Sequence, residues 1–335
     1  MTSPDVVAEV LQYFPAATGA SRWTALGSAG GFSGARLWRV TTLQGDYCLR
    51  RWPPDHPDET RLQFIHSVLR LAYDHGLREA PLPVPSIHGE TFVRHHGFLW
   101  ELAPWMPGEA DYHRRPSVQK LQSALQWLAR FHVATAPPRA TVAPSPGIQE
   151  RSELLRRLQL HESQEIARRL QTIHWPEFAI RGQRILKAFA REAHNLGVRL
   201  AASASVACPL QPCIRDIWHD HVLFLEDKVS GVVDFGAMRI ECVSADISRL
   251  LGSLVGNDPQ GWRQGLEAYS RVRPLSVAER QLCEVFDAST SLLSGMNWLR
   301  WICLEQRSFD EPDRVLARLD EILLRLPRPQ VGLIE

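Results

Sequence analysis

The chain has 335 residues, of which 44% are hydrophobic and 22% are charged, as is ordinary for a globular protein of one large or two smaller domains. Its formal net charge of +1 offers no basic surface to nucleic acid or to an anionic membrane, and no apolar run approaches the roughly 20 residues of a membrane-spanning helix. These properties argue against nucleic-acid and membrane partners, and they leave the oligomeric state open.

The first residues lack the basic and apolar regions of a signal peptide, and the six cysteines are scattered without a Cys-x-x-Cys pair. This pattern favours reduced thiols and a cytoplasmic location over a disulfide framework or a zinc site. Apolar residues within 1–20 predict a short amphipathic helix that ends at Pro15.

Strand and turn patterns dominate the chain as far as residue 103. A flexible glycine turn lies at 29–35, and the apolar spacing within 59–75 is that of an amphipathic helix. Alternation of apolar residues predicts four strand-like stretches, at 37–41, 47–52, 86–88 and 98–102. We therefore expect a small, mainly antiparallel sheet with one helix.

Residues 104–108, Pro-Trp-Met-Pro-Gly, have the composition of a linker. Beyond them helical periodicity prevails up to about residue 325. It is clearest in four segments, 118–132, 149–172, 177–200 and 245–255. The chain thus reads as a small sheet lobe, a hinge and a larger helical lobe.

A hairpin at 214–236 interrupts the helices. Its predicted strands are Val222–Leu225 and Val229–Val233, joined by a polar turn, with Asp216 before the first strand and Asp234 after the second. Because the two ends of a hairpin lie close in space, these carboxylates are expected to be neighbours. A base beside a metal-holding carboxylate is what phosphoryl transfer from a nucleotide requires.

The residues Val229-Ser-Gly-Val-Val-Asp-Phe-Gly236, followed by Ala245-Asp-Ile-Ser-Arg-Leu-Leu251, resemble the C-terminal core of aminoglycoside phosphotransferases and choline-kinase-like enzymes. The resemblance covers about residues 25–325 and is specific over 214–251. It implies an α+β, bilobal protein-kinase-like fold that binds ATP and Mg²⁺ between its lobes. The lobes would be 1–103 and 109–335, with the hinge at 104–108.

The resemblance also implies roles in the hairpin. It makes Asp216 the catalytic base and Asp234 the metal-binding carboxylate. His221 occupies the place of the family's Asn, a second magnesium ligand, and Ile214 the place of its His. Imidazole suits zinc, copper or iron better than magnesium, so His221 would assist through hydrogen bonds, or Asp220 would supply the oxygen.

The nucleotide-binding residues follow from the same resemblance. No lysine precedes Lys120, and Arg50 stands where the family's phosphate-binding Lys is expected, since a guanidinium can grip phosphate. Its acidic partner is not evident among Glu59, Gln63 and His66. Backbone N–H groups would cover the phosphates at Gly30, Gly31, Ser33 and Gly34. The hinge would meet adenine through the Pro104 carbonyl and the Met106 N–H.

The late helices are where the family binds its substrates. Trp298, Trp301 and Glu305 lie at helical spacing and are the candidate substrate wall. The expected activity is ATP-dependent phosphorylation of a small-molecule hydroxyl group. The acceptor stays open, because the family acts on aminoglycosides, choline, amino alcohols, methylthioribose and homoserine.

Two alternatives remain. The altered loop and the missing lysine also fit a catalytically impaired, kinase-like nucleotide-binding or regulatory protein. In addition, His219 and His221 would share one face of a strand, and with Asp216 or Asp234 they would form the 2-His-1-carboxylate site of a metal-dependent hydrolase or oxygenase. That last reading leaves the two lobes and the hairpin unexplained.

Overall fold

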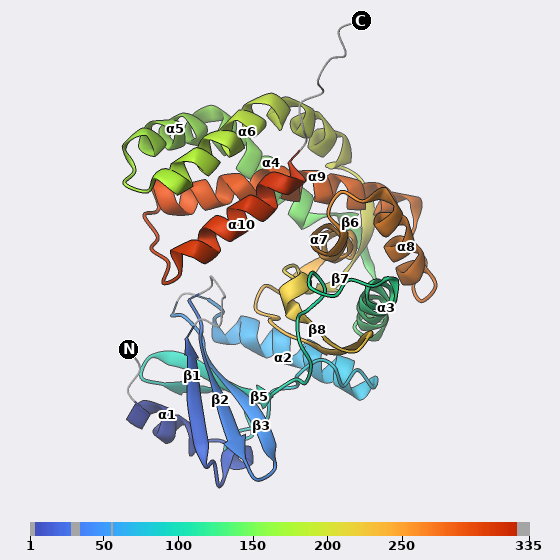
Figure 1. The fold of residues 1–335 in the computed structure, drawn as a ribbon. Helices are drawn as coiled ribbons and strands as arrows, with labels where there is room; N and C mark the ends of the chain where they lie inside the picture. Colours follow the sequence, from blue (N-terminus) through green and yellow to red (C-terminus); the bar gives the residue numbers. More distant parts are fainter. Residues whose placement is uncertain (1–3, 28–33, 55, 327–335) are drawn as a thin grey trace, which may run out of the picture. The chain divides into compact units, whose positions relative to one another are not determined.

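The structure is a computed structural model that describes residues 4–27, 34–54 and 56–326 (Figure 1). The chain forms two compact units. The first comprises Met1–Pro137, Ile214–Arg239 and Arg263–Pro274, and the second comprises Pro138–Cys213, Ile240–Trp262 and Leu275–Glu335. The lobe boundaries at 103 and 109 stay a prediction. No helix in the described ranges combines the length and the apolar character needed to cross a bilayer.

A five-stranded antiparallel sheet, in the order β1-β2-β3-β5-β4, is the scaffold of the first unit. Its strands are β1 Arg22–Gly27, β2 Arg36–Thr42, β3 Gly45–Arg51, β4 Val93–His95 and β5 Phe98–Pro104. The predicted sheet is confirmed, but the strand expected at 86–88 is wrong. There the Ser86 N–H donates to the Glu90 carbonyl at 2.7 Å and the chain turns at Gly89, whose φ is +84°, so this stretch is a turn and not a strand.

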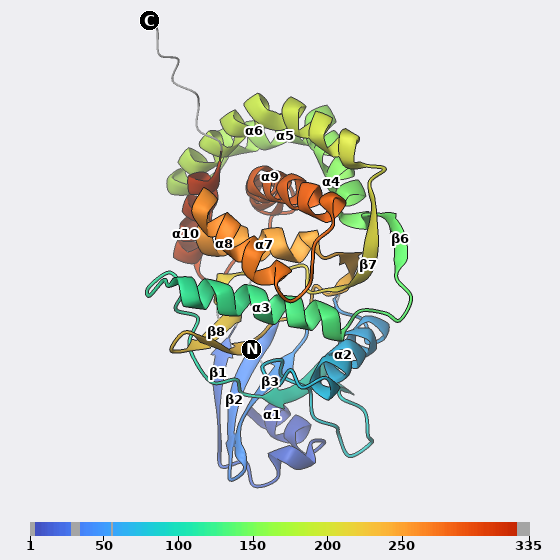
Figure 2. The same cartoon turned by 90° about the vertical axis from the view of Figure 1, so that its right-hand side faces the viewer.

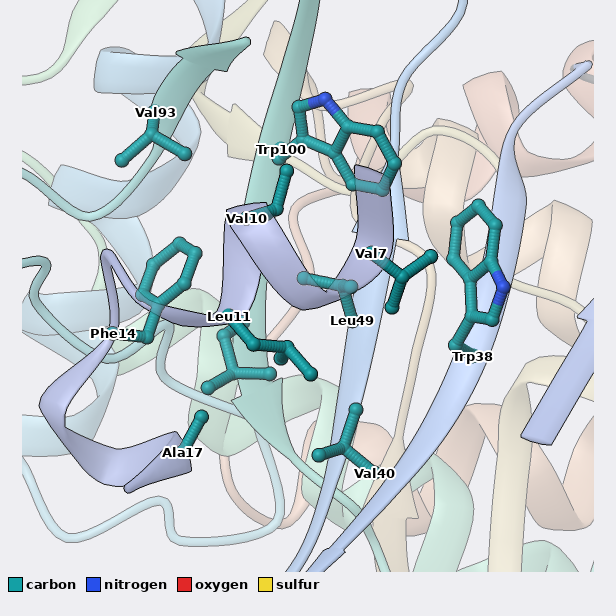
Figure 3. Close-up of a cluster of buried hydrophobic side chains, with 11 residues drawn as sticks. Val7, Val10, Leu11, Phe14, Ala17, Trp38, Val40, Leu49, Val93 and Trp100 are labelled. Carbon is teal, nitrogen blue, oxygen red and sulfur yellow. The ribbon is translucent and has the colours of Figure 1, made fainter. Parts of the chain in front are cut away.

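Helix α1, Pro4–Leu11, covers one face of this sheet. Val7, Val10 and Leu11 of α1 pack with strand residues that include Trp38 and Trp100, whose rings lie 5.4 Å apart (Figure 3). The short apolar helix predicted near the N-terminus is therefore part of the core of the first unit.

Helix α2, Glu59–Asp74, lies against the other face, and its start is capped by Asp58, which accepts the Arg61 N–H at 2.8 Å. Leu62 of α2 packs with Leu99 and Trp52 in a second apolar cluster. Because side chains alternate along a strand, residues two positions from Leu99 or Trp52 face α2 as well. This alternation directs Arg50 of β3 and Glu101 of β5 toward α2.

The predicted hairpin is confirmed as β8, Val222–Leu225, and β9, Lys228–Val232, preceded by a short 3₁₀ helix, His219–His221. It packs on α3, Val118–Ala134, where the Val229 N–H donates to Ser123 Oγ at 2.9 Å. Helix α8, Pro259–Ser270, places the Tyr269 hydroxyl 2.7 Å from Nδ1 of His132 in α3.

The second unit is mainly helical, as expected for the later part of the chain (Figure 2). Its long helix α9 packs against α4, α6, α7 and α10. The helices are α4 Pro146–Arg157, α5 Ser163–Thr172, α6 Pro176–Ser203, α7 Ser244–Val255, α9 Val277–Leu299 and α10 Pro312–Arg325.

A three-stranded sheet, in the order β10-β7-β6, accompanies these helices and was not predicted. Its strands are β6 Thr141–Pro144, β7 Ala207–Cys213 and β10 Arg239–Cys242. The strand β7 contains Pro209 and Pro212, which cannot donate ladder hydrogen bonds and so weaken its strand signal.

Candidate active site

The end of β9 delivers Asp234 to the centre of the candidate site. The hairpin closes through Val222 opposite Val232, and the Val233 N–H donates to the His221 carbonyl at 2.9 Å. Asp234 then adopts a φ of +66°, a region that Asp tolerates better than most residues. The next residue, Phe235, is buried with its ring 6.0 Å from that of Phe131, which anchors the turn on α3.

The segment after Asp234 is also held by residues near the start of α2. Nη1 of Arg61 donates to the Met238 carbonyl at 2.8 Å, and Nε2 of His56 lies 3.2 Å from the Gly236 carbonyl. A Cβ at Gly236 would come within 2.9 Å of the Trp52 ring, so only glycine fits without a shift.

The Asp234 carboxylate is held in its charged form. Burial raises its pKa, but the guanidinium of Arg50, the ring of His221 and the Gly236 N–H together lower the pKa below the ordinary value of 3.8. Nη1 of Arg50 lies 3.2 Å from Oδ1, whereas Oδ2 lies 3.6 Å from Nε2 of His221. About a third of the side chain, 35%, is exposed, so a ligand can reach it.

Arg50 has the acidic partner that the sequence did not reveal. Nε of Arg50 lies 3.7 Å from Oε1 of Glu101, and Oε2 of Glu101 lies 2.9 Å from Nε2 of His66 in α2. Burial raises the pKa of Glu101, but the hydrogen bond to His66 and the charges of His66 and Arg50 outweigh it and lower the pKa. His66 of α2 is therefore linked to Arg50 through the carboxylate of Glu101.

The position of Glu101 explains why the sequence reading missed it. Glu101 belongs to β5 and lies directly opposite Arg50 in the β3–β5 register, whereas the partner was expected on α2. One signal was present, because Glu101 is the single charged residue of the otherwise apolar strand Phe98–Pro104. A buried charge in such a strand needs a partner.

His221 is fixed by two hydrogen bonds. Nε1 of Trp218 donates to Nε2 of His221 at 2.9 Å, and Nδ1 of His221 lies 2.8 Å from the Asp216 carbonyl. An indole N–H can only donate, so Nε2 accepts and the proton resides on Nδ1. The Nε2 lone pair of His221 is thus occupied by Trp218.

The structure places Asp216 in the loop before β8, with an exposed side chain. Its neighbour Arg215 has a φ of +69°, and Ile214 and Ile217 are fully buried on either side. Ile214 is thus part of the apolar core that anchors the loop.

His219 and His221 do not lie on a strand, so the geometry expected for a two-histidine metal site is wrong. Both belong to the 3₁₀ helix before β8, where Nε2 of His219 lies 3.4 Å from Oδ1 of Asp220. The ring of His219 packs edge-on against His113 at 4.1 Å. Within the described ranges, no group of three potential metal ligands includes either histidine.

The hinge candidates lie at the end of β5. Pro104 is the last residue of β5, and the Met106 side chain packs on Gly231, where a Cβ would come within 2.7 Å of the Met106 Cβ. Glu109 and Phe224 exchange backbone hydrogen bonds at 3.1 and 2.9 Å. The Ser230 hydroxyl donates to the Pro107 carbonyl at 2.7 Å. Residues 106–109 are thus joined to the hairpin by packing and hydrogen bonds.

The other candidates are distributed as follows. Gly34 has a φ of +82°, whereas Gly30, Gly31 and Ser33 lie outside the described residues. Lys120 is buried and its Nζ lies 2.7 Å from Oδ1 of Asp111, so the first lysine of the chain is engaged in that pair.

The candidate substrate wall belongs to the second unit. Trp298 is buried at the end of α9, with its ring 5.1 Å from that of Trp301. The Arg307 guanidinium lies 5.0 Å from the centre of the Trp301 ring, and Glu305 is exposed. The role of these residues stays a prediction.

A comparison with protein-family models identifies the family of the chain. The family model described as "Phosphotransferase enzyme family" (APH) matches residues 25–282. No curated protein matches the chain.

Solved structures share the fold at low sequence identity. The amicoumacin kinase hAmiN, solved with AMP-PNP, Ca²⁺ and Ami, has a TM-score of 0.62 at 16% identity, covering 98% of this chain and 95% of that chain. A microcompartment-associated aminopropanol kinase has a TM-score of 0.60 at 13% identity, covering 97% and 99%. An aminoglycoside phosphotransferase from Alicyclobacillus acidocaldarius has a TM-score of 0.55 at 16% identity, covering 96% and 98%.

These likenesses confirm the α+β, protein-kinase-like fold expected from the sequence. The match to the family model extends over most of the chain and includes β2 to β5, residues 104–108 and the hairpin. The chain belongs to the phosphotransferase enzyme family.

Proposed function

We propose that the protein transfers the terminal phosphoryl group of ATP to a hydroxyl group of a small molecule. The observation that carries this proposal is the position of Arg50, which lies 3.2 Å from Asp234 and 3.7 Å from Glu101. In kinase-like folds, a basic side chain paired with one carboxylate lies beside a second carboxylate that binds the metal ion. Together these groups position the phosphates of the nucleoside triphosphate.

Each residue would have a defined task in this reaction. The exposed carboxylate of Asp216 would orient the acceptor hydroxyl and accept its proton. Arg50 would bind phosphate oxygens, with backbone N–H groups of the turn at Gly30, Gly31, Ser33 and Gly34. The Pro104 carbonyl and the Met106 N–H would bind adenine. Because the transition state is loose, positioning and charge stabilisation supply most of the acceleration.

The residues at Asp234 fit magnesium, and His221 does not. Carboxylate oxygen is the donor that Mg²⁺ prefers, and Asp234 is charged and partly exposed. Nε2 of His221 instead accepts the Trp218 N–H, and imidazole is a poor magnesium ligand. Asp220, whose side chain is exposed, would supply a second oxygen. When bound there, magnesium would neutralise part of the negative charge of the ATP phosphates.

The relatives support a proposal for the acceptor class. Their structures contain or are named for amicoumacin, aminopropanol, spectinomycin and kanamycin. By extension we propose a hydroxylated small molecule for this chain. Trp301 and Glu305 would contribute an aromatic surface and a carboxylate, and Trp298 would support them from the core. A cationic group on that molecule would have to replace Arg307, which lies 5.0 Å from the centre of the Trp301 ring and 2.7 Å from Oε2 of Glu305.

A second candidate, nucleotide binding without turnover, is favoured by one observation. By the resemblance His221 stands in the place of a family Asn, and its Nε2, which lies 3.6 Å from Oδ2 of Asp234, is occupied by Trp218. A site with one metal ligand fewer would bind ATP and stabilise the transition state less.

The substitution Asp216→Asn distinguishes the candidates. Transfer from ATP to a panel of hydroxylated metabolites would be measured together with ATP affinity by calorimetry, with Glu226→Gln, an exposed change in the hairpin turn, as the matched control. The base assignment predicts a loss of at least about 10²-fold in turnover with unchanged ATP affinity. Equal loss of turnover and ATP binding contradicts that assignment. ATP binding by the wild type without turnover on any acceptor supports the second candidate.

A further inference from the structure

A second group of polar side chains converges in the first unit and shares no residue with the candidate active site. Nε2 of His95 lies 2.9 Å from Oε2 of Glu9, and Nε2 of His96 lies 3.4 Å from the same oxygen. The three potential ligand atoms all lie within 4.8 Å of one another. Glu9 belongs to α1, and the two histidines belong to the end of β4 and the turn that follows it.

The backbone explains how two consecutive histidines reach one carboxylate. Neighbouring side chains on a strand point to opposite faces. Here His96 and Gly97 have φ values of +49° and +78°, as the central residues of a two-residue type I′ turn do. The turn brings the centres of the His95 and His96 imidazole rings to 4.4 Å, with an angle of 68° between the ring planes.

The rest of the turn is held in place. Nε1 of Trp100, a fully buried side chain, donates to the His95 carbonyl at 3.1 Å. The Tyr13 ring lies 5.8 Å from that of His95. Val7 and Val10, on either side of Glu9, are buried in the core beneath the sheet, so α1 presents Glu9 from a fixed position. The three groups are therefore arranged by the fold.

We propose that Glu9, His95 and His96 bind one zinc ion or a similar divalent transition-metal ion. Zinc takes imidazole nitrogen and carboxylate oxygen at about 2.0–2.2 Å in a tetrahedron, which places ligand atoms about 3.3 Å apart. The distance from Glu9 Oε2 to Nε2 of His95 is slightly shorter than this value, at 2.9 Å, and the distance to Nε2 of His96 is slightly longer, at 3.4 Å. The side chains of Glu9 and His96 are 51% and 60% exposed, so the ion has access and water completes the coordination.

The donor set also determines which ion is excluded. Two imidazoles and one carboxylate select zinc, copper or nickel over Mg²⁺, which prefers oxygen ligands. The site therefore does not compete for the magnesium proposed at Asp234. A bound ion would tie α1 to the β4–β5 turn and stabilise the folded first unit by mass action.

The test uses the full chain, freed of metal by chelation, with saturating Mg²⁺ present throughout. Calorimetry with Zn²⁺ and the visible spectrum with Co²⁺ would be recorded for the wild type, Glu9→Gln and His96→Gln. His194→Gln, an exposed histidine of α6, is the control. Unfolding curves in chelator show that every variant is folded.

We expect the wild type and His194→Gln to show a saturable 1:1 zinc site and the Co²⁺ bands of a tetrahedral complex. At a free zinc concentration of 100 times the dissociation constant, the ratio of folded to unfolded protein rises about 100-fold. Glu9→Gln and His96→Gln should each weaken zinc at least about tenfold. Zinc binding that is absent in the wild type, or unchanged in both variants, overturns the proposal.

Discussion

The guanidinium of Arg50 lies 3.2 Å from the carboxylate of Asp234, although the two residues are 184 positions apart in the chain. The same guanidinium faces Glu101 across two neighbouring strands. Arg50 therefore lies between a structural carboxylate and the proposed metal-binding one. Phosphate oxygens that bind Arg50 would compete with Asp234 for the guanidinium. The Asp234 carboxylate would then be more available to bind a cation.

Removal of the Arg50 charge should impair catalysis strongly. We expect Arg50→Met to lower kcat/KM by about 10²–10³-fold, because one charged donor to the phosphates is lost. Arg50→Lys, which keeps the charge and introduces the family's residue, should retain most of the activity. The control is Arg51→Met on the opposite face of β3, where the guanidinium lies 4.3 Å from the centre of the Phe98 ring. Equal losses at both positions would contradict a specific role for Arg50.

The buried carboxylate of Glu101 should make stability depend on pH. Its folded-state pKa lies below the ordinary value of 4.5, so its contribution is complete above pH 4.5 and is lost as the pH falls through the lower, folded-state pKa. Between pH 5 and about pH 3 the unfolding free energy of the wild type should fall more steeply than that of Glu101→Gln. Denaturant titrations across this range measure the difference, and parallel curves would show that Glu101 does not titrate with folding.

Substitution at His221 tests the metal site. An Asn side chain would offer a carbonyl oxygen where Nε2 is now occupied by Trp218. We expect His221→Asn to reduce the Mg²⁺ concentration for half-maximal activity at least about tenfold, the scale on which ligand shells alter metal binding. Trp218→Phe removes the N–H while keeping an aromatic ring, and it is the control for loss of the hydrogen bond. A slower His221→Asn enzyme would instead assign a positive role to the imidazole.

The contact between the hinge and the hairpin should be sensitive to a single methyl group. A Cβ at Gly108, whose φ is +100°, would lie 2.6 Å from the Phe224 carbonyl oxygen and would also meet the Ser230 hydroxyl. Gly89 has a similar φ of +84° and nothing within 4 Å of such a Cβ. Gly108→Ala should therefore destabilise the protein by about 1–3 kcal/mol more than Gly89→Ala. The difference between the thermal unfolding midpoints of the two variants measures the cost of the steric clash at position 108. Equal midpoints would contradict the predicted clash.

The hairpin shows what local sequence can predict. Alternating apolar residues, a polar turn and Asp-Phe-Gly at its end place β8, β9 and Asp234 correctly, because each signal concerns residues adjacent in the chain. Strand β4 was missed, since Val93–His95 is only three residues long and carries no alternation that stands out from its surroundings.

Pairing across the fold was harder to predict. The partner of Arg50 depends on the register of β3 against β5, which no local pattern contains. The occupied nitrogen of His221 depends on how the Trp218 ring turns in the loop, although the two residues are only three positions apart. Propensity and spacing determine which element carries a side chain, whereas packing determines what that side chain meets.

The two-way backbone exchange between Glu109 and Phe224 has a consequence for the evolution of this chain. An insertion or deletion near Pro107 would shift Glu109. Because Glu109 is hydrogen-bonded to Phe224 of β8, this shift would also displace β8 and β9. The length of this segment is therefore coupled to the position of Asp234 at the end of β9. Relatives that change the segment should carry a compensating change in the turn at Glu226-Asp227.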